Sequence, residues 1–259
     1  MSLSRIISAS LLFAGACIAA DSAFVGKWKL NESSSDFGTD VWTMNRAASG
    51  EMESVQFAGT YKFRIDGKPY KAALNQTAVW KNIDATTWEL VYNPDQKGHE
   101  GFGVTTLTLS QAGNRLTAVT KGTMWNGLPE DYTYTYQRSG TGAGLAGRWE
   151  AKMPKASTAD GLEMSAFGRD GIFVKFSDDT TGCGALLDGK DAPCSGKDYP
   201  PKTTLALTAP GPRDLVAVYK YGGTLELKVG LSVSTDGKTL TIRNAFGGGK
   251  ESILVYDRQ

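Results

Sequence analysis

Phe24-Val25-Gly26-Lys27-Trp28-Lys29-Leu30 decides the fold of this chain, because a second version, Leu145-Ala146-Gly147-Arg148-Trp149-Glu150, follows about 120 residues later. Matching tripeptides end the two halves: Tyr136-Gln137-Arg138 closes the first and Tyr256-Asp257-Arg258 closes the second. The chain is therefore expected to contain two similar units, each with Gly-x-Trp near its start and Tyr-x-Arg at its end.

The 259 residues divide accordingly into a leader and two domains. The repeat predicts domains at 21–138 and 145–259, each long enough to bury its own core. The Gly-, Ser- and Thr-rich stretch at 139–144 has the composition of a flexible linker. The Gly-x-Gly-x-x-Gly pattern at 142–147 does not indicate a dinucleotide site, because a strand rather than a helix is expected after it.

Alternating apolar and polar residues predict strands throughout both units. In Leu225-Glu226-Leu227-Lys228-Val229-Gly230-Leu231-Ser232-Val233, every second residue is Leu or Val. Turn sequences such as Asp66-Gly67-Lys68 and Asp236-Gly237-Lys238 separate the runs, as in hairpins. We predict an all-β protein with two tandem antiparallel barrels of about eight strands each, since closure leaves no exposed sheet edge.

The first twenty residues have the pattern of a secretory signal, with Arg5 before an apolar run and small residues at Ala19-Ala20. Cleavage there would release a periplasmic or secreted protein. In the alternative, Ala14-Gly15-Ala16-Cys17 acts as a lipoprotein box and leaves a lipid anchor on Cys17. The apolar run is too short for a transmembrane span, and no other segment fits one.

Two cysteines, Cys183 and Cys194, remain once Cys17 is set aside. In an oxidising compartment they are expected to form a disulfide that holds a Gly- and Asp-rich insertion. Their spacing is too wide for a Cys-x-x-Cys redox or metal motif.

Composition argues against several functions. With Arg5 removed, basic and acidic residues balance, and no basic cluster suited to nucleic acid is present. His99, in a polar turn, is the single histidine, so two His-based sites are excluded. Aspartates crowd the insertion around Cys183 and Cys194 but lack a calcium-loop pattern, and we predict no metal and no cofactor.

A Gly-x-Trp on the first strand and an Arg on the last resemble the lipocalin superfamily, and more closely small exported bacterial lipocalin-like proteins of unknown function. The resemblance implies that the Arg packs across the Trp ring and closes the barrel. Carried over to this chain, it pairs Trp28 with Arg138 and Trp149 with Arg258. Neither unit has room for the helix that follows the barrel in typical lipocalins, and Cys183 and Cys194 do not match that family's usual disulfide.

Aromatic residues are concentrated in the first unit, which holds five of the six tryptophans of the chain. A small barrel can be filled by such side chains or can enclose one ligand. We therefore expect a small apolar ligand in the first barrel. The candidate binding residues are Trp42, Tyr61, Phe63, Trp80, Trp88, Tyr92 and Trp125.

The function expected from these features is that of an exported, non-enzymatic binding protein. One alternative is a structural or interaction module of the cell envelope, with both barrels filled. Another is a barrel enzyme that uses Asp, Glu or Tyr, although no catalytic constellation of such residues is recognisable in the sequence.

Overall fold

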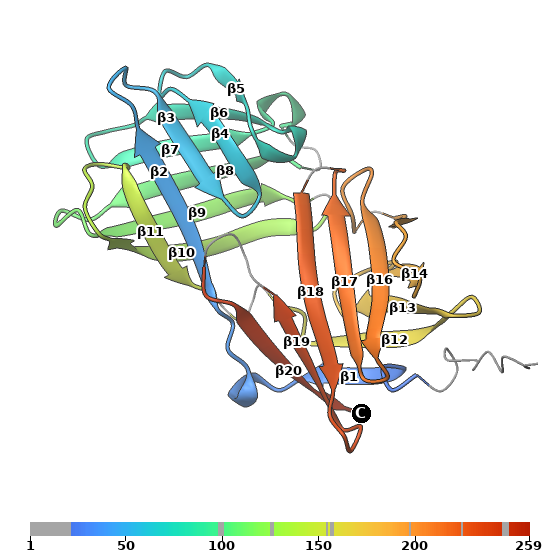
Figure 1. Ribbon diagram of the computed structural model, residues 1–259. Coiled ribbons are helices and arrows are strands. Elements are labelled where there is room, and N and C mark those ends of the chain that lie inside the picture. The colour runs from blue at the N-terminus through green and yellow to red at the C-terminus, as the bar shows by residue number, and fades with distance from the viewer. Residues whose placement is uncertain are drawn as a thin grey trace, which may run out of the picture.

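The computed structural model describes residues 22–97, 101–124, 127–153, 155, 158–196, 198–223, 225–244 and 249–259. Within these residues the protein contains strands and three short 3-10 turns, at Glu32–Ser34, Ala73–Asn75 and Pro94–Gln96, and no α-helix. The strands form two antiparallel sheets of ten strands each, and each sheet curls into a nearly closed barrel (Figure 1). The all-β fold class with two barrels is thus confirmed.

The first barrel has the spatial strand order β4-β3-β2-β11-β10-β9-β8-β7-β6-β5. Its strands are β2 Thr39–Arg46, β3 Met52–Gln56, β4 Gly59–Phe63, β5 Pro69–Lys71, β6 Thr77–Asn82, β7 Thr87–Tyr92, β8 Gly103–Leu109, β9 Arg115–Thr123, β10 Pro129–Ser139 and β11 Gly147–Lys152. The end strands β4 and β5 lie next to each other, which nearly closes the sheet.

The second barrel has the order β14-β13-β12-β1-β20-β19-β18-β17-β16-β15. Its strands are β1 Gly26–Leu30, β12 Gly161–Phe167, β13 Gly171–Phe176, β14 Cys183–Leu186, β15 Ala192–Pro193, β16 Thr204–Gly211, β17 Asp214–Tyr221, β18 Leu225–Val233, β19 Thr239–Asn244 and β20 Ser252–Arg258. Very short strands such as β5 and β15 explain why each sheet has more strands than the apolar pattern predicted.

The two barrels exchange their Gly-x-Trp strands. Strand β1, from the first unit, lies between β12 and β20 of the second barrel, and β11, from the second unit, lies between β2 and β10 of the first. Figure 1 shows β1 in blue beside the red β20, and the yellow-green β11 beside the blue β2. The predicted boundaries at 138 and 145 therefore follow the sequence repeat and not the barrels. In space, the first barrel comprises residues 39–152, and the second comprises residues 26–30 together with 161–258.

The connection between β10 and β11 accounts for this exchange. Residues 140–146 form a short link that lets β11 pair with β10, Trp149 lying opposite Arg138. A local pairing of this kind costs less loop-closure entropy than recruiting β1 from the far end of the chain. The stretch predicted to be an inter-domain linker is thus a hairpin connection inside the first barrel.

The Trp–Arg contacts exist, but with exchanged partners. The Arg138 guanidinium carbon lies 4.0 Å from the ring centre of Trp149, and that of Arg258 lies 4.1 Å from the ring centre of Trp28. The expected pairing of Trp28 with Arg138 and of Trp149 with Arg258 is therefore wrong. We call each Trp–Arg pair with its surrounding backbone contacts a clasp.

Both clasps share one hydrogen-bond pattern. Arg258 donates from Nε to the Gly237 carbonyl at 2.6 Å and from Nη1 to the Val25 carbonyl at 2.7 Å. Arg138 repeats this with the carbonyls of Gly113 and Ala146. Each guanidinium thereby joins the Trp strand, the last strand and a hairpin turn of one barrel.

The glycine of Gly-x-Trp is required by the clasp. Gly26 and Gly147 have φ angles of +146° and +145°, which side chains rarely adopt. A Cβ atom at Gly26 would lie 2.6 Å from Nη1 of Arg258, and Gly147 is equally close to Arg138. The motif therefore reflects a close approach of the guanidinium to the backbone.

Beyond β1 the chain crosses from the second barrel to the first through residues 31–38. Asp36 pairs with Ile253 of β20 through two backbone hydrogen bonds of 2.9 and 2.7 Å. Thr39, the first residue of β2, exchanges hydrogen bonds with Lys250. These contacts tie the crossing segment to the second barrel.

Candidate functional site

The second barrel encloses a cavity of about 390 Å³. Its lining comes mainly from inward-facing residues of the strands, joined by residues of two loops and of the junction with the first barrel. The described lining residues are Phe37, Phe57, Met153, Thr158, Ala159, Met164, Val174, Phe176, Asp178, Asp179, Asp198, Tyr199, Leu207, Leu215, Ala217, Tyr219, Tyr221, Leu227, Val229, Leu231, Ile242, Asn244, Ser252, Leu254 and Tyr256.

Strand alternation explains why this lining is largely apolar. On β17, Leu215, Ala217 and Tyr219 are buried and face the cavity, while Val216 and Val218 point to the opposite side of the sheet. Aliphatic side chains of β18 and β19 continue the surface. A cavity of this size and polarity is suited to a small apolar molecule.

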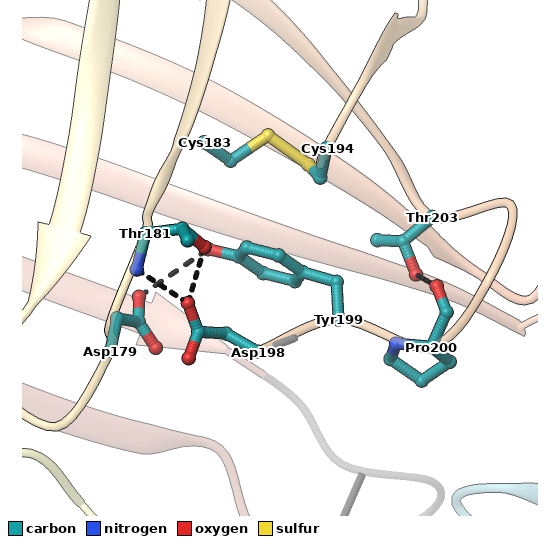
Figure 2. Close-up of a disulfide and its surroundings, with 8 residues drawn as sticks. All are labelled: Asp179, Thr181, Cys183, Cys194, Asp198, Tyr199, Pro200 and Thr203. Carbon is teal, nitrogen blue, oxygen red and sulfur yellow. Dashed lines mark hydrogen bonds between the residues drawn. A yellow bond between two sulfur atoms is a disulfide. The ribbon is translucent and has the colours of Figure 1, made fainter. Parts of the chain in front are cut away.

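Polar groups enter the cavity from the loop after β13. The Asp179 carboxylate accepts hydrogen bonds at Oδ2 from the Phe176 N–H at 3.1 Å and from the Tyr199 hydroxyl at 3.4 Å. Burial, together with the negative charges of Asp198 and Asp178, raises the pKa of Asp179 above its usual value. Figure 2 shows Tyr199 reaching across to Asp179.

Asp198 holds the same loop in place. Its carboxylate accepts hydrogen bonds from the backbone and the hydroxyl of Thr180 and of Thr181. Burial alone would raise the pKa of Asp198, but these hydrogen bonds outweigh it and lower that pKa to about 2. Asp198 is therefore ionised at neutral pH.

The Cys183–Cys194 disulfide flanks these groups (Figure 2). The Sγ atoms are 1.98 Å apart, which confirms the pairing predicted from the sequence. Cys183 begins β14, and Cys194 donates its backbone N–H to the Thr203 carbonyl at 2.9 Å. The bridge thus fixes the segment that carries Asp198 and Tyr199 against the loop that carries Asp179.

Tyr219 contributes a hydroxyl that has no hydrogen-bond partner among the described residues. The residue is only 7% exposed, it lines the cavity, and its hydroxyl makes no hydrogen bond to any residue within the described part of the chain. Its ring stacks on that of Tyr221, with centroids 5.8 Å apart. A bound molecule could therefore complete the hydrogen bonding of Tyr219.

The first barrel contains a cavity of about 370 Å³ with a more polar lining. The Tyr136 hydroxyl donates to Asp40 at 2.6 Å, and the buried hydroxyls of Thr105 and Thr120 are 2.8 Å apart. Glu130 also lines this cavity, and burial raises the pKa of its carboxyl.

Most of the aromatic residues expected to bind a ligand in the first barrel lie in its packed core. Phe63 stacks on Trp80 with ring centroids 4.4 Å apart, and Tyr61 and Trp88 belong to the same buried cluster. Of the expected residues, Trp42 and Tyr92 line the cavity. Trp125 and His99 lie outside the described residues, as do the signal segment and Cys17.

The two cavities share Phe57 and Met153 in their linings. Phe57 lies in the β3–β4 turn of the first barrel, and Met153 directly follows β11. The cavities therefore approach each other at the junction between the barrels, with these two side chains between them.

Residues of the second-barrel cavity were not among the sequence candidates. The signal that could have found them is the alternation Val216-Ala217-Val218-Tyr219-Lys220-Tyr221, which puts two tyrosines on the inward face of a strand otherwise lined by small and aliphatic residues. Among the described residues no cluster of three or more His, Cys, Asp or Glu side chains is arranged to hold a metal.

In the part of the chain that the structure describes, no helix is long and apolar enough to cross a membrane. Comparisons with protein-family models, with curated proteins and with solved structures each give no match to this chain. The structure thus assigns the chain to a fold class, a pair of nearly closed antiparallel β-barrels.

Proposed function

We propose that this protein is an exported, lipocalin-like binding protein that holds a small, largely apolar molecule in the cavity of its second barrel. The observation that carries the proposal is the interior of about 390 Å³, lined mostly by aliphatic and aromatic side chains. Cavities of about 300–1,000 Å³ with a few placed polar groups are typical of small-molecule sites.

Two features support the lipocalin-like and exported parts of the proposal. The barrels, each closed by an Arg over a Trp, agree with the resemblance seen in the sequence. The Cys183–Cys194 disulfide is the kind of bond that persists in oxidising compartments. Cell fractionation and the mass of the mature chain test export and distinguish cleavage near Ala20 from a lipid on Cys17.

Filling the cavity tests the binding function. Ala217 faces the cavity and is 4% exposed, so Ala217→Phe should occupy part of the space and weaken binding of the neutral dye Nile red by at least about tenfold. Val218→Phe places the same ring on the other face of β17 and is the matched control. Equal affinities for the two variants, both with native near-UV circular dichroism, would contradict the proposal.

The first-barrel cavity is a second candidate site, favoured by its tyrosine and threonine hydroxyls and by the position of Trp42 and Tyr92 in its lining. A ligand there would be more polar than one in the second barrel. Native mass spectrometry of protein purified from its own host would show whether one or two small molecules are carried. The absence of any ligand from protein with intact barrels would instead favour a structural or interaction role.

A further inference from the structure

All the charged side chains among the described residues that line the second-barrel cavity are carboxylates. They are Asp178, Asp179 and Asp198, and no Lys or Arg accompanies them in that lining. In a recessed, partly open site with largely apolar walls, such charges act more strongly than in bulk water. The cavity therefore has a negative potential at its polar end.

The first-barrel cavity has the same sign. Its charged lining residues within the described part of the chain are Asp40 and Glu130. Because the two cavities share Phe57 and Met153, a molecule at the junction meets carboxylates in either direction. Both interiors thus disfavour anions.

Asp179 is the carboxylate placed to receive a ligand. Its two hydrogen bonds both engage Oδ2, which leaves Oδ1 without a hydrogen bond from any described residue. By contrast, Asp198 is engaged by two threonines that donate from backbone and hydroxyl groups. Asp179 can therefore accept a hydrogen bond from a ligand at Oδ1 while it keeps the hydrogen bonds from Phe176 and Tyr199 at Oδ2.

Tyr219 supplies an independent indication that a ligand group belongs here. Tyr219 is a buried residue that lines the cavity, and its hydroxyl makes no hydrogen bond within the described part of the chain. Asp179, Tyr219 and Tyr221 line the same cavity, and the negative charge of Asp179 contributes to the raised pKa of both tyrosine hydroxyls. An acceptor oxygen, two tyrosine rings and a carboxylate together suit an ammonium group, because cations bind both to oxygens and to aromatic faces.

We infer that the second-barrel cavity binds lipophilic amines: molecules with an apolar chain or ring system and one ammonium group, held at Asp179 with Tyr219 and Tyr221 beside it. Carboxylic acids of the same shape are rejected, because an anionic head would have to be buried next to like charges. This inference rests on the proposed binding function and names the ligand class for that site.

Three ten-carbon probes that differ only in their head group test the inference: decylamine, decanol and decanoate. Calorimetric titration into the full mature protein at neutral pH should give the order amine, alcohol, acid, with decylamine at least about tenfold tighter than decanol. Decanoate binding as tight as decylamine binding would overturn the inference. If none of the three probes binds, the proposed binding function is contradicted, and the inference that rests on it falls as well.

Substitution of Asp179 locates the head group. Asp179→Asn should remove most of the preference for decylamine while decanol binding stays, which also shows that the cavity is intact. Glu163→Gln is the matched control, because it removes one charge from an exposed pair with Lys27 on the same barrel and should change neither affinity. If Asp179→Asn kept the full preference for decylamine, the assignment of the head group to Asp179 would be contradicted. If Asp179→Asn does not fold, the order in which wild type binds the three probes still decides the charge preference of the cavity.

Discussion

At the scale of single residues, Arg138 and Arg258 define how each barrel closes. Each guanidinium covers a Trp ring and at the same time donates to backbone carbonyls of two segments, a hairpin turn and the residues just before the Trp strand. The indole N–H of Trp149 in turn donates to the Leu145 carbonyl at 2.8 Å. Such a cluster should respond to substitution as one unit.

A double-mutant cycle tests this coupling and its exchanged partners. Trp149→Ala should cost about 3–5 kcal/mol in the free energy of unfolding, as for other buried tryptophans. Combined with Arg138→Ala, the loss should fall short of the sum by about 1–2 kcal/mol, because the two side chains lose the same contact. The pair Trp28→Ala and Arg138→Ala should be additive in denaturant unfolding; strong coupling there would contradict the observed pairing.

Asp198 predicts a dependence of stability on pH. Its pKa is about 2 in the folded protein, below the value of about 3.9 for an unfolded chain. A lowered pKa stabilises the fold above the unfolded value, and this contribution disappears as pH falls from about 4 to 2. Asp198→Asn should therefore lower the free energy of unfolding by about 1–2 kcal/mol at pH 7, after allowance for solvent screening of this partly exposed group.

The stabilities of Asp198→Asn and wild type should converge as pH falls through about 2, because the wild-type carboxyl is then protonated as well. Urea unfolding at several pH values measures the difference, and Glu163→Gln provides an exposed control. A difference that stayed constant from pH 7 to 2 would show that the hydrogen bonds of Asp198 do not depend on its charge.

At the scale of elements, the disulfide holds together the two loops that bring polar groups to the second cavity. The Cys183–Cys194 bridge spans a sequence separation of 11 residues. Closing a loop of this size stabilises a fold by about 3 kcal/mol in the chain-entropy model. The loop that the bridge closes contains strand β14 at its start and the two-residue strand β15 near its end.

Replacement of both cysteines by serine should therefore lower the free energy of unfolding by about 3 kcal/mol. It should also weaken decylamine binding more than decanol binding, because Asp179 and Tyr199 lose their fixed separation. Calorimetry on the double variant and on reduced wild type checks both effects. Unchanged affinity for both probes would show that the disulfide does not support ligand binding.

At the scale of the whole molecule, the strand exchange pairs two strands that lie far apart in the sequence. Strand β1 pairs with β20, so the second barrel closes only after both of these strands have formed. The first barrel is a continuous segment and already contains its own Trp strand, β11. Stability of the two barrels should therefore respond differently to truncation.

A chain that begins at Phe37, and so lacks β1, should keep the first barrel folded while the second opens between β12 and β20. Hydrogen exchange should rise across 161–258 and remain slow across 39–152. If the barrels followed the sequence repeat instead, the first barrel would lose its protection. The truncation thus distinguishes the exchanged arrangement, in which the second barrel loses protection, from barrels that follow the sequence repeat, in which the first would lose it.

The sequence by itself determined the local features: the strand alternation, the hairpin turns, the two-fold repeat, the Cys183–Cys194 pair and the residues of both clasps. These follow from short-range patterns, because alternation sets which face of a strand is apolar, and a glycine is needed where a guanidinium meets the backbone. Two equivalent Gly-x-Trp strands, however, fit either barrel equally well by pattern alone.

Only the tertiary structure decided which partner each strand takes and which side chains line each cavity. The choice of partner depends on chain connectivity, since β11 reaches β10 through a short link while β1 does not. The lining depends on how side chains fill space. In the first barrel, Phe63 and Trp80 stack on each other in the core and the remaining cavity has a more polar lining, whereas smaller apolar side chains of the second barrel leave a cavity that Asp179 and Tyr219 also line. Neither outcome is contained in the alternation of residues along a strand.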